Sequence, residues 1–243
     1  MMYKMATEGS DFDVVLKEAQ QKGYAEADPT ADVEGYDACR KIAILSSLAY
    51  GKFLNYEDVY TEGITKITPE DMEYAEELGM TIKLLGTSRK LEDGSFSALV
   101  APFMVGQKSP LYSVNDVFNA VFVHGNMLGD AMFYGSGAGK LPTASAVVAD
   151  VVDEAKHLNR NIMTMWKNEK LELLPLDNTS KKFFVRIKGD SEAMKAHLES
   201  SFGPISIVKV DGLNGEFGFV TEEMTEGSYK EKSAEFPGII HMI

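Results

Sequence analysis

A block of β-type sequence, residues 80–134, lies between segments with helical periodicity, and this separation limits the folds open to the chain. The block begins with MTIKLLGTSRKL, a Glu92-Asp93-Gly94 turn and SFSALVAPFMV, which together predict a β-hairpin whose turn allows positive φ. Two further strands are predicted at residues 117–123 and 126–134. Helices that are separated from strands along the chain are typical of α+β proteins. We therefore predict an α+β fold in which helices pack on one face of a mixed β-sheet.

Helices are predicted where apolar residues recur at helical spacing between caps or glycines. They cover residues 1–6, 11–22, 33–50, 69–79 and 142–157. The clearest start is at Thr68, which can cap a helix that has Pro69 at its first position.

The C-terminal quarter of the chain has a different pattern. Residues 181–243 are predicted to form strand, helix, strand, strand, helix and strand, the order of a ferredoxin-like split βαβ unit. We therefore predict two domains, residues 1–158 and 181–243, joined by a polar connector at residues 159–180.

Charge and composition exclude several classes of protein. The 24 basic and 37 acidic residues give a net charge of −13, which repels a phosphate backbone, so no nucleic-acid partner is expected. No run approaches the ~20 apolar residues of a membrane span. The N-terminus has no apolar signal region, and the single cysteine, Cys39, favours a reducing compartment, so a cytoplasmic location is expected. The four histidines have no metal-ligand spacing, and no metal is expected.

The helix predicted over residues 33–50 carries the first candidate site. Asp37 and Lys41 are four residues apart and share one face. At about 100° per residue, Ile44 and Leu48 fall on the same stripe, and a second apolar stripe lies beside it. We therefore expect the ion pair to be buried, which would suit the lysine for general acid/base work. The alternative is an exposed pair worth a few tenths of a kcal/mol.

The loop that leads into this helix is rich in carboxylates. They are Glu26, Asp28, Asp32 and Glu34. Such acids either complement the helix dipole or hold a cationic group such as a substrate ammonium. Their spacing matches no known loop for Mg²⁺ or Ca²⁺.

A glycine-rich junction, Gly135-Ser136-Gly137-Ala138-Gly139, precedes the helix that contains Pro142 and Thr143. Such a junction lets a backbone approach a ligand and places N–H groups at a helix start. It fits neither a P-loop, because Leu141 stands where Ser or Thr is required, nor a dinucleotide fingerprint. A tight turn without a ligand is the alternative.

Two of these segments resemble a known family. GYAEADPTADVEGYDACRKIAIL, residues 23–45, closely resembles the substrate-site segment of homoserine dehydrogenases, and GSGAGKLPTASAVVAD, residues 135–150, resembles that family's second signature. Residues 181–243 resemble the ACT-type regulatory domain that many members carry. The resemblance implies an NAD(P)-dependent, homodimeric oxidoreductase that interconverts L-homoserine and L-aspartate 4-semialdehyde in threonine and methionine biosynthesis.

The resemblance also implies roles for single residues. Lys41 would exchange a proton with the C4 oxygen of the substrate, and Asp37 would position it. The amino-acid end of the substrate would be lined by Tyr24, Glu26 and Asp32. The nicotinamide would lie near Gly137, Gly139 and Thr143.

The chain also departs from the family pattern. The family's N-terminal nucleotide-binding domain has no counterpart in these residues, so we expect a fragment that is inactive alone. The alternative function is a non-catalytic module that dimerises or senses an amino acid. The loop at residues 188–192 lacks the Asp-Arg-Pro-Gly pattern of ligand-binding ACT domains, so weak or no threonine binding is expected.

Overall fold

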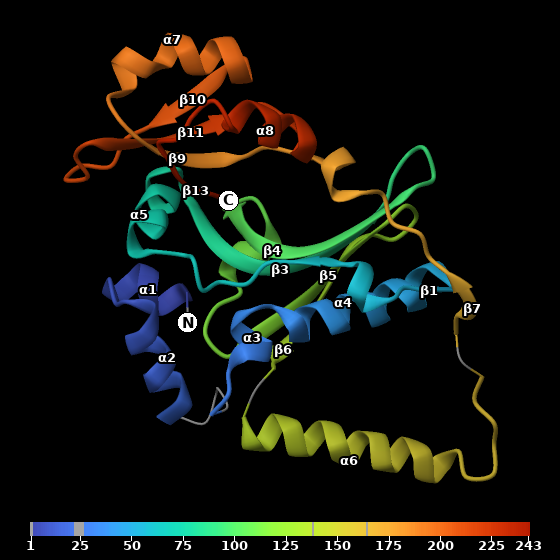
Figure 1. Ribbon diagram of the computed structural model, residues 1–243. Helices are drawn as coiled ribbons and strands as arrows, with labels where there is room; N and C mark the ends of the chain where they lie inside the picture. The colour runs from blue at the N-terminus through green and yellow to red at the C-terminus, as the bar shows by residue number, and fades with distance from the viewer. Residues whose placement is uncertain (1, 22–26, 138, 164) are drawn as a thin grey trace.

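The computed structural model, shown in Figure 1, describes residues 2–21, 27–137, 139–163 and 165–243. Its centre is a three-stranded mixed sheet in the order β2-β4-β3. These strands are β2 (Tyr60–Thr61), β3 (Met80–Lys90) and β4 (Phe96–Gly106). β3 and β4 form an antiparallel hairpin, with Met80 opposite Gly106 and Lys90 opposite Phe96, and β2 runs parallel to β4. The predicted hairpin is therefore confirmed.

Three helices cover one end of this sheet. They are α1 (Met2–Glu8), α2 (Phe12–Gln21) and α5 (Pro69–Glu77). Their buried side chains, among them Met5, Val15 and Met72, pack against Ile82 of β3. Thr68 caps α5 as predicted. Its side chain accepts a hydrogen bond from the N–H of Asp71, whose carboxylate accepts one from the N–H of Thr68.

The helix predicted over residues 33–50 is interrupted. The structure has α3 (Thr30–Val33) and α4 (Tyr36–Tyr50), with Gly35 between them in the left-handed region at φ 79°. A Cβ at this position would lie 3.1 Å from Val100 of β4, so the break brings the chain close to the sheet. The single-helix prediction was wrong because it overlooked this contact.

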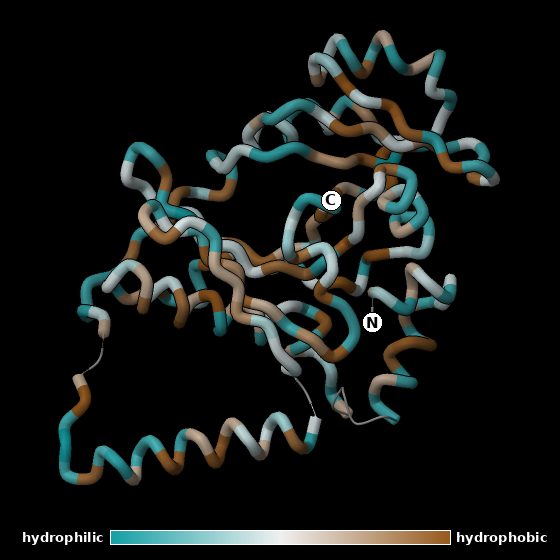
Figure 2. The backbone as a smooth tube through the Cα atoms, turned by 180° about the vertical axis from the view of Figure 1, so that it is seen from behind, coloured by the Kyte–Doolittle hydropathy of each residue, from teal (hydrophilic) through white to brown (hydrophobic). Residues whose placement is uncertain are grey.

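A second hairpin and a long helix follow the central sheet in the chain. The hairpin joins β5 (Phe118–Gly125) to β6 (Gly129–Ser136) in a separate two-stranded antiparallel sheet. It is followed by α6 (Lys140–Lys156), which has no buried residue. Figures 1 and 2 both show α6 standing apart from the central sheet, although Figure 2 colours several of its residues as hydrophobic.

The stretch at residues 159–180 is more than a polar connector. Its strand β7 (Lys167–Lys170) pairs in parallel with β1 (Lys52–Phe53). Leu171 is 1% exposed and packs in the same core as Cys39 and Leu54. Three 3-10 helices complete the loops: η1 (Tyr56–Asp58), η2 (Pro110–Ser113) and η3 (Leu176–Asn178). Because Leu171 fills the N-terminal core, this stretch belongs structurally to the N-terminal unit.

The C-terminal unit has the predicted strand–helix–strand–strand–helix–strand order, with one additional short strand. Its antiparallel sheet has the order β10-β11-β9-β13. The elements are β9 (Phe184–Lys188), α7 (Ser191–Phe202), β10 (Ile205–Val208), β11 (Glu216–Thr221), α8 (Glu226–Ser233) and β13 (Ile239–Met242). The additional strand, β12 (Met224–Thr225), pairs with β8 (Ser180–Lys181).

Both faces of this C-terminal sheet are covered. Val185 and Ile187 point toward α7 and α8, where they join a core with Phe219. Alternate residues of β9 point the other way, toward the N-terminal unit. There Phe184 packs against Tyr74 of α5, with ring centroids 5.5 Å apart.

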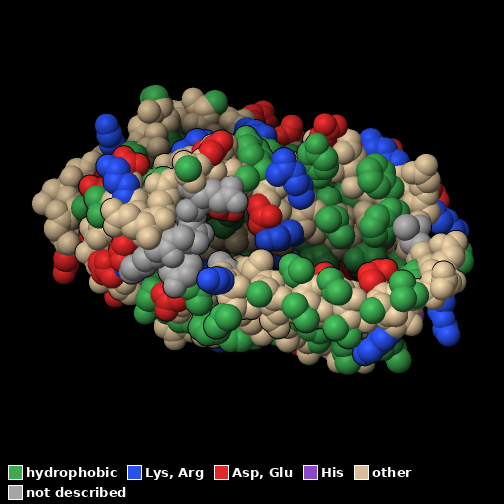
Figure 3. Space-filling model, turned by 90° about the horizontal axis from the view of Figure 1, so that it is seen from below, with side chains coloured by type: hydrophobic (Ala, Val, Ile, Leu, Met, Phe, Trp, Pro, Cys, Tyr) green, Lys and Arg blue, Asp and Glu red, His purple; other side chains and the backbone are tan. Residues whose placement is uncertain are grey.

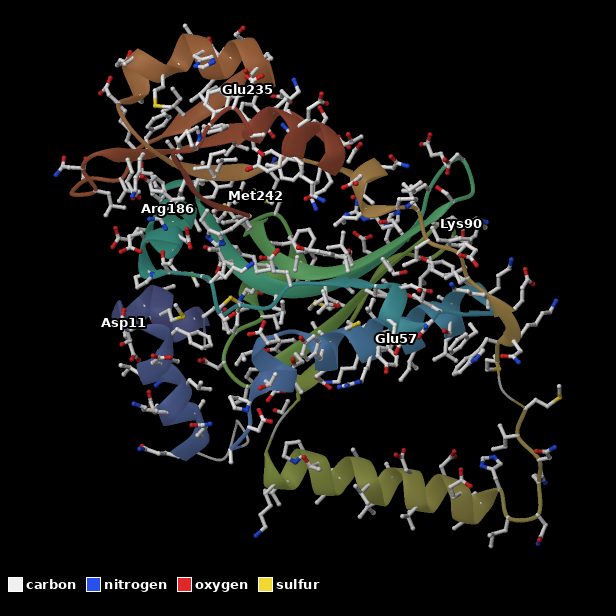
Figure 4. The ribbon with its side chains drawn as sticks, viewed as in Figure 1. Asp11, Glu57, Lys90, Arg186, Glu235 and Met242 are labelled. Carbon is white, nitrogen blue, oxygen red and sulfur yellow. The ribbon has the colours of Figure 1, made fainter. Side chains whose placement is uncertain are left out.

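A buried group of charged side chains also joins the two units, and Figure 4 shows Arg186 pointing from β9 toward α5. Nη1 of Arg186 lies 2.7 Å from Oδ1 of Asp71, which is 0% exposed. Nη2 of Arg186 lies 2.9 Å from Oε1 of Glu216, and Nδ1 of His241 lies 2.8 Å from Oδ2 of Asp71. The two units therefore share one core and one ionic cluster.

Candidate functional site

Lys41 and Asp37 meet on the first two turns of α4. Nζ of Lys41 donates a hydrogen bond to Oδ2 of Asp37 at 2.5 Å. The two side chains are 70% and 46% exposed, respectively. The predicted pairing is therefore confirmed, whereas the predicted burial of the pair is wrong.

The buried side of α4 is the opposite one. Cys39 and Ala43 face β4, together with Ser46 and Ser47. The two serine hydroxyls donate hydrogen bonds to the carbonyls of Ile42 and Ala43, at 2.7 and 2.8 Å, so they can be buried at little cost. The sequence-based interpretation placed the apolar Ile44 and Leu48 inside instead.

The exposed side of α4 is unusually apolar around the ion pair. Ile44, Leu45 and Leu48 are 53%, 39% and 44% exposed. The carboxylate of Asp37 and the ammonium of Lys41 therefore sit at the edge of an apolar surface. Anything that covered this surface would desolvate the pair, which strengthens its electrostatic interaction and suits it for proton transfer.

The acidic segment before α4 is described only in part. Asp32 is exposed on α3. Oδ1 of Asp28 accepts hydrogen bonds from Oγ1 of Thr30 at 2.6 Å and from its N–H at 3.1 Å, and these bonds lower the pKa of Asp28. Tyr24 and Glu26 lie outside the described residues. Asp28 therefore organises the start of α3. Of the three residues that the resemblance places around the amino-acid end of the substrate, the structure describes Asp32.

The glycine-rich junction packs tightly against β5. The N–H of Gly137 donates to the carbonyl of Val117 at 3.0 Å, and a Cβ on Gly137 would collide with the amide of Asn119. Gly139 has φ 117°, and its carbonyl accepts the N–H of Thr143 at 3.1 Å. Gly137 and Gly139 are therefore required by the packing and the backbone conformation of the junction, as the tight-turn alternative predicted. Thr143 is exposed on α6.

The two candidate segments start on the same side of the molecule. In Figure 1 the N-terminal end of α6 lies below α3 and the start of α4. Figure 3 looks at the molecule from this side and shows many hydrophobic side chains on a face that is hollowed along its middle. The large exposed hydrophobic residues of the two hairpin strands and α6 are Phe118, Val121, Val123, Met132, Phe133, Tyr134, Leu141, Val147, Val148, Val151 and Val152. We call these residues, with Ile44, Leu45 and Leu48, the exposed apolar face.

The described residues form neither a metal cluster nor a membrane-spanning helix. No group of three or more His, Cys, Asp and Glu residues is placed to hold a metal ion. None of the described helices is long and apolar enough to cross a bilayer.

The exposure of the ion pair leads to a prediction for Asp37→Asn. We expect this variant to change the free energy of unfolding by no more than about 0.5 kcal/mol, because an exposed pair contributes little. Urea titration of the variant and the wild type measures this difference. A loss above about 1.5 kcal/mol would show that the pair is buried after all.

The chain resembles homoserine dehydrogenases in sequence. The family model described as "Homoserine dehydrogenase" matches residues 1–152. A homoserine dehydrogenase of Neisseria gonorrhoeae is 43% identical over 200 residues, which cover 79% of this chain and 46% of that relative. One from Synechocystis sp. is 38% identical over 100% of this chain and 63% of its own length. The chain thus spans about half the length of the curated relatives that it matches.

Solved structures show the same likeness. A homoserine dehydrogenase from Thiobacillus denitrificans superposes with a TM-score of 0.83 at 34% identity, covering 99% of this chain and 59% of that one. The S. aureus homoserine dehydrogenase at pH 7.5 gives a TM-score of 0.77 at 32% identity, covering 98% and 59%. The likeness therefore extends over both units of the chain.

Proposed function

The chain belongs to the homoserine dehydrogenase family, and from this premise we propose that it supplies the substrate-binding part of an NAD(P)-dependent oxidoreductase. The enzyme would interconvert L-homoserine and L-aspartate 4-semialdehyde, as a step of threonine and methionine biosynthesis. The observation that carries this proposal is the Lys41–Asp37 pair on α4, directly after the acidic segment and inside the residues that the family model matches. A non-catalytic module is not favoured, because the relatives that match are enzymes.

In the proposed reaction, Lys41 moves a proton at the C4 oxygen. During oxidation of homoserine, its neutral amine accepts the hydroxyl proton, and during reduction of the aldehyde its ammonium donates the proton back. Oδ2 of Asp37 accepts a hydrogen bond from Nζ at 2.5 Å, and this bond orients the lysine. A proton transfer by a positioned side chain contributes about 10²–10⁴-fold to the rate.

We place one end of a nicotinamide cofactor at the start of α6. Gly139 and Thr143 lie at the start of α6, where backbone groups can approach a ring or a ribose closely. The side chain of Asn119 occupies the space that a Cβ on Gly137 would need. Glycine is therefore required at this position so that the junction can pack close to β5, and we assign Gly137 this role. When it is bound, NAD(P) supplies or accepts the hydride at C4.

We assign the amino-acid end of the substrate to Tyr24, Glu26 and Asp32. The substrate ammonium is positive, and the segment before α4 carries a concentration of carboxylates, so the charges are complementary. Asp32 is exposed on α3, in the segment that leads into α4.

Glu26→Gln tests this assignment. We expect the KM for homoserine to rise about tenfold to a hundredfold, because a hydrogen bond to a charged group is lost, while the KM for the cofactor stays nearly unchanged. Steady-state kinetics of the full-length enzyme measure both constants. Asp28→Asn is the matched control from the same loop, since the carboxylate of Asp28 is engaged by Thr30. An unchanged KM for homoserine would assign Glu26 to the helix dipole instead.

The exposed apolar face supports a homodimer. A helix such as α6, with no buried residue and five large exposed apolar side chains, gains stability mostly when its apolar side is packed. We propose that a second copy of the chain packs on the β5–β6 hairpin. In the assembled enzyme, which we place in the cytoplasm, the apolar side of α6 would also be covered.

We propose that residues 181–243 form an ACT-type regulatory unit. The loop after β9 lacks the Asp-Arg-Pro-Gly pattern of ligand-binding ACT domains, and its Asp190 caps α7.

The 243 residues expressed alone are expected to show no turnover with NADPH and aspartate semialdehyde. The sequence contains no glycine-rich βαβ fingerprint to hold a pyrophosphate, and a few contacts at α6 do not offset an association cost of ~4–15 kcal/mol. The absorbance of NADPH, followed over time, tests this. Steady turnover that disappears in Lys41→Ala would show that this chain holds a complete cofactor site.

A further inference from the structure

Lys83 lies in the first half of β3, and its half-buried side chain reaches a segment about thirty residues further along the chain. Its Nζ donates hydrogen bonds to the carbonyl oxygen of Val114 at 2.6 Å and to Oδ1 of Asn115 at 2.5 Å. Burial lowers the pKa of Lys83, although the charge of Asp116 acts in the opposite direction. The amine is therefore partly withdrawn from water, where a hydrogen bond is stronger than at an exposed site.

The segment that Lys83 reaches leads into β5 and is not part of the central sheet. Within the described residues, the β5–β6 hairpin forms a sheet of its own and shares no strand pairing with β3 or β4. A hollow of about 200 Å³ lies between β3 and this segment, and Leu111, Val114 and Phe118 are among the residues that line it. Where strand pairing and close packing are both missing, the stability of a local contact depends strongly on its remaining hydrogen bonds. The two bonds of Lys83 therefore hold the entry to β5 on the central sheet.

A series of contacts connects this entry to the glycine-rich junction. The carbonyl of Asn115 accepts a hydrogen bond from the N–H of Phe118 at 3.2 Å, which closes the turn into β5. The carbonyl of Val117 accepts the N–H of Gly137 at 3.0 Å, and the side chain of Asn119 lies directly beside Gly137. The helix α6 begins shortly after this glycine. A shift of the entry to β5 would therefore move the junction and the start of α6 with it.

The same strand supports the helix that carries the lysine–aspartate pair. At Gly86 of β3, a Cβ would lie 3.1 Å from Cβ of Ile42 and 3.5 Å from the carbonyl oxygen of Ala38, so α4 packs directly on the strand there. Ile42 follows Lys41 in the sequence. Groups that are carried by one regular strand are held in a more precise relative position than groups on separate loops. The strand β3 therefore relates α4, through Gly86, to the start of α6, through Lys83.

We propose that Lys83 is a positioning residue of the reaction: it holds the entry to β5 on β3 and thereby sets the start of α6, where we place the nicotinamide, relative to Lys41. The inference rests on the proposed function, because it concerns the same two segments. Lys83 acts through Val114 and Asn115 and takes no part in the proton transfer. Hydride transfer depends on the geometry of the reacting atoms, so a loosened junction would slow the reaction without removing any reacting group.

Hydrogen exchange of the whole chain, followed by mass spectrometry, tests the attachment itself. Lys83→Met keeps an unbranched side chain of similar length and removes the donor. Peptides that cover residues 114–137 are expected to exchange about tenfold to a hundredfold faster in this variant, because the closed form loses two hydrogen bonds. Peptides of the β3–β4 hairpin should keep the wild-type rate. Lys108→Met, which removes an exposed lysine between β4 and η2, is the matched control and should leave all rates unchanged.

Steady-state kinetics of the full-length enzyme test the effect on the reaction. Lys83→Met is expected to lower kcat by about tenfold to a hundredfold, since a misplacement of about 1 Å caused by a distant substitution can cost that much, while the KM for homoserine stays within a few-fold. Lys83→Arg keeps donors at this position and should recover most of the loss. Asn115→Ala removes one of the two acceptors and should show a smaller effect of the same kind, which keeps the test valid if Lys83→Met does not fold.

The inference is overturned if residues 114–137 exchange at the wild-type rate in both Lys83→Met and Asn115→Ala. It is also overturned if these residues exchange faster while kcat is unchanged, or if Lys83→Arg is as slow as Lys83→Met. A failure of the proposed function gives a different result: Lys41→Ala would then keep wild-type turnover, whereas the exchange rates would still report the attachment made by Lys83.

Discussion

Lys41→Ala in the full-length enzyme is expected to lower kcat by about 10²–10⁴-fold and to change the KM for homoserine far less. The reason is that the ammonium of Lys41 would act on the reacting oxygen, where charge develops only as the proton moves. Steady-state kinetics in both directions provide the measurement. Asp37→Asn is expected to lower kcat by a smaller factor, because it disturbs the position of Lys41 without removing the group that transfers the proton.

Lys66→Ala is the matched control for Lys41→Ala. Lys66 is 72% exposed and forms an i,i+4 pair with Glu62 at 3.1 Å, in a turn before α5, so each variant removes the exposed lysine of an i,i+4 ion pair. We expect Lys66→Ala to retain wild-type kcat. If Lys41→Ala also stayed within a few-fold of wild type, Lys41 would be only a member of a surface ion pair.

Asp71→Ala is expected to lower the free energy of unfolding by about 3 kcal/mol, which is the low end of the range for breaking a buried ion pair. The carboxylate of Asp71 is fully buried and contacts both Arg186 and His241. Its removal leaves the guanidinium of Arg186 buried with Glu216 at 2.9 Å, the hydroxyl of Thr68 at 2.8 Å and the partly exposed Glu70 at 4.0 Å as its partners. Urea unfolding at pH 7 measures the loss. Glu73→Gln, at an exposed position of the same helix, should leave the stability unchanged.

The same carboxylate predicts how stability depends on pH. Burial alone would raise the pKa of Asp71, but hydrogen bonds and charges from His241 and Arg186 outweigh it and lower the pKa below its ordinary value. Asp71 therefore contributes stability above the pKa of an unfolded aspartate, about 3.9, and this contribution is lost as the pH falls through the folded pKa. Asp71→Asn should flatten the loss of stability below about pH 4. An unchanged acid limb would contradict this role.

Several elements were predictable because their causes are local. The β3–β4 hairpin follows from two apolar runs around a turn, and the start of α5 follows from Thr68, Pro69 and Asp71, all within four residues. The pairing of Lys41 with Asp37 follows from the geometry of one helical turn. Each of these features depends on residues that are close in sequence, so the chain alone carries the necessary information.

The face that α4 buries could not be predicted in the same way. Periodicity identifies stripes on a helix, but the choice between them depends on what the opposing surface offers. Ser46 and Ser47 are buried because their hydroxyls bond to the carbonyls of their own helix, while Ile44 and Leu48 remain on the exposed apolar face. The error therefore arose because residue polarity alone was used to choose the inward side.

Sequence pattern alone was enough for the α+β class, the order of the main elements of the C-terminal unit, the β3–β4 hairpin, the cap at Thr68 and the family, since these depend on local pattern and on motifs that are continuous in the chain. Three features became clear from the packing alone: the exposure of the Lys41–Asp37 pair, the place of Leu171 in the N-terminal core, and the contact of Arg186 with Asp71, 115 residues away in the chain. The physical reason is that burial and long-range ion pairs depend on which surfaces come into contact when the units pack. The pattern of residues within one segment does not specify which distant surface that segment will contact.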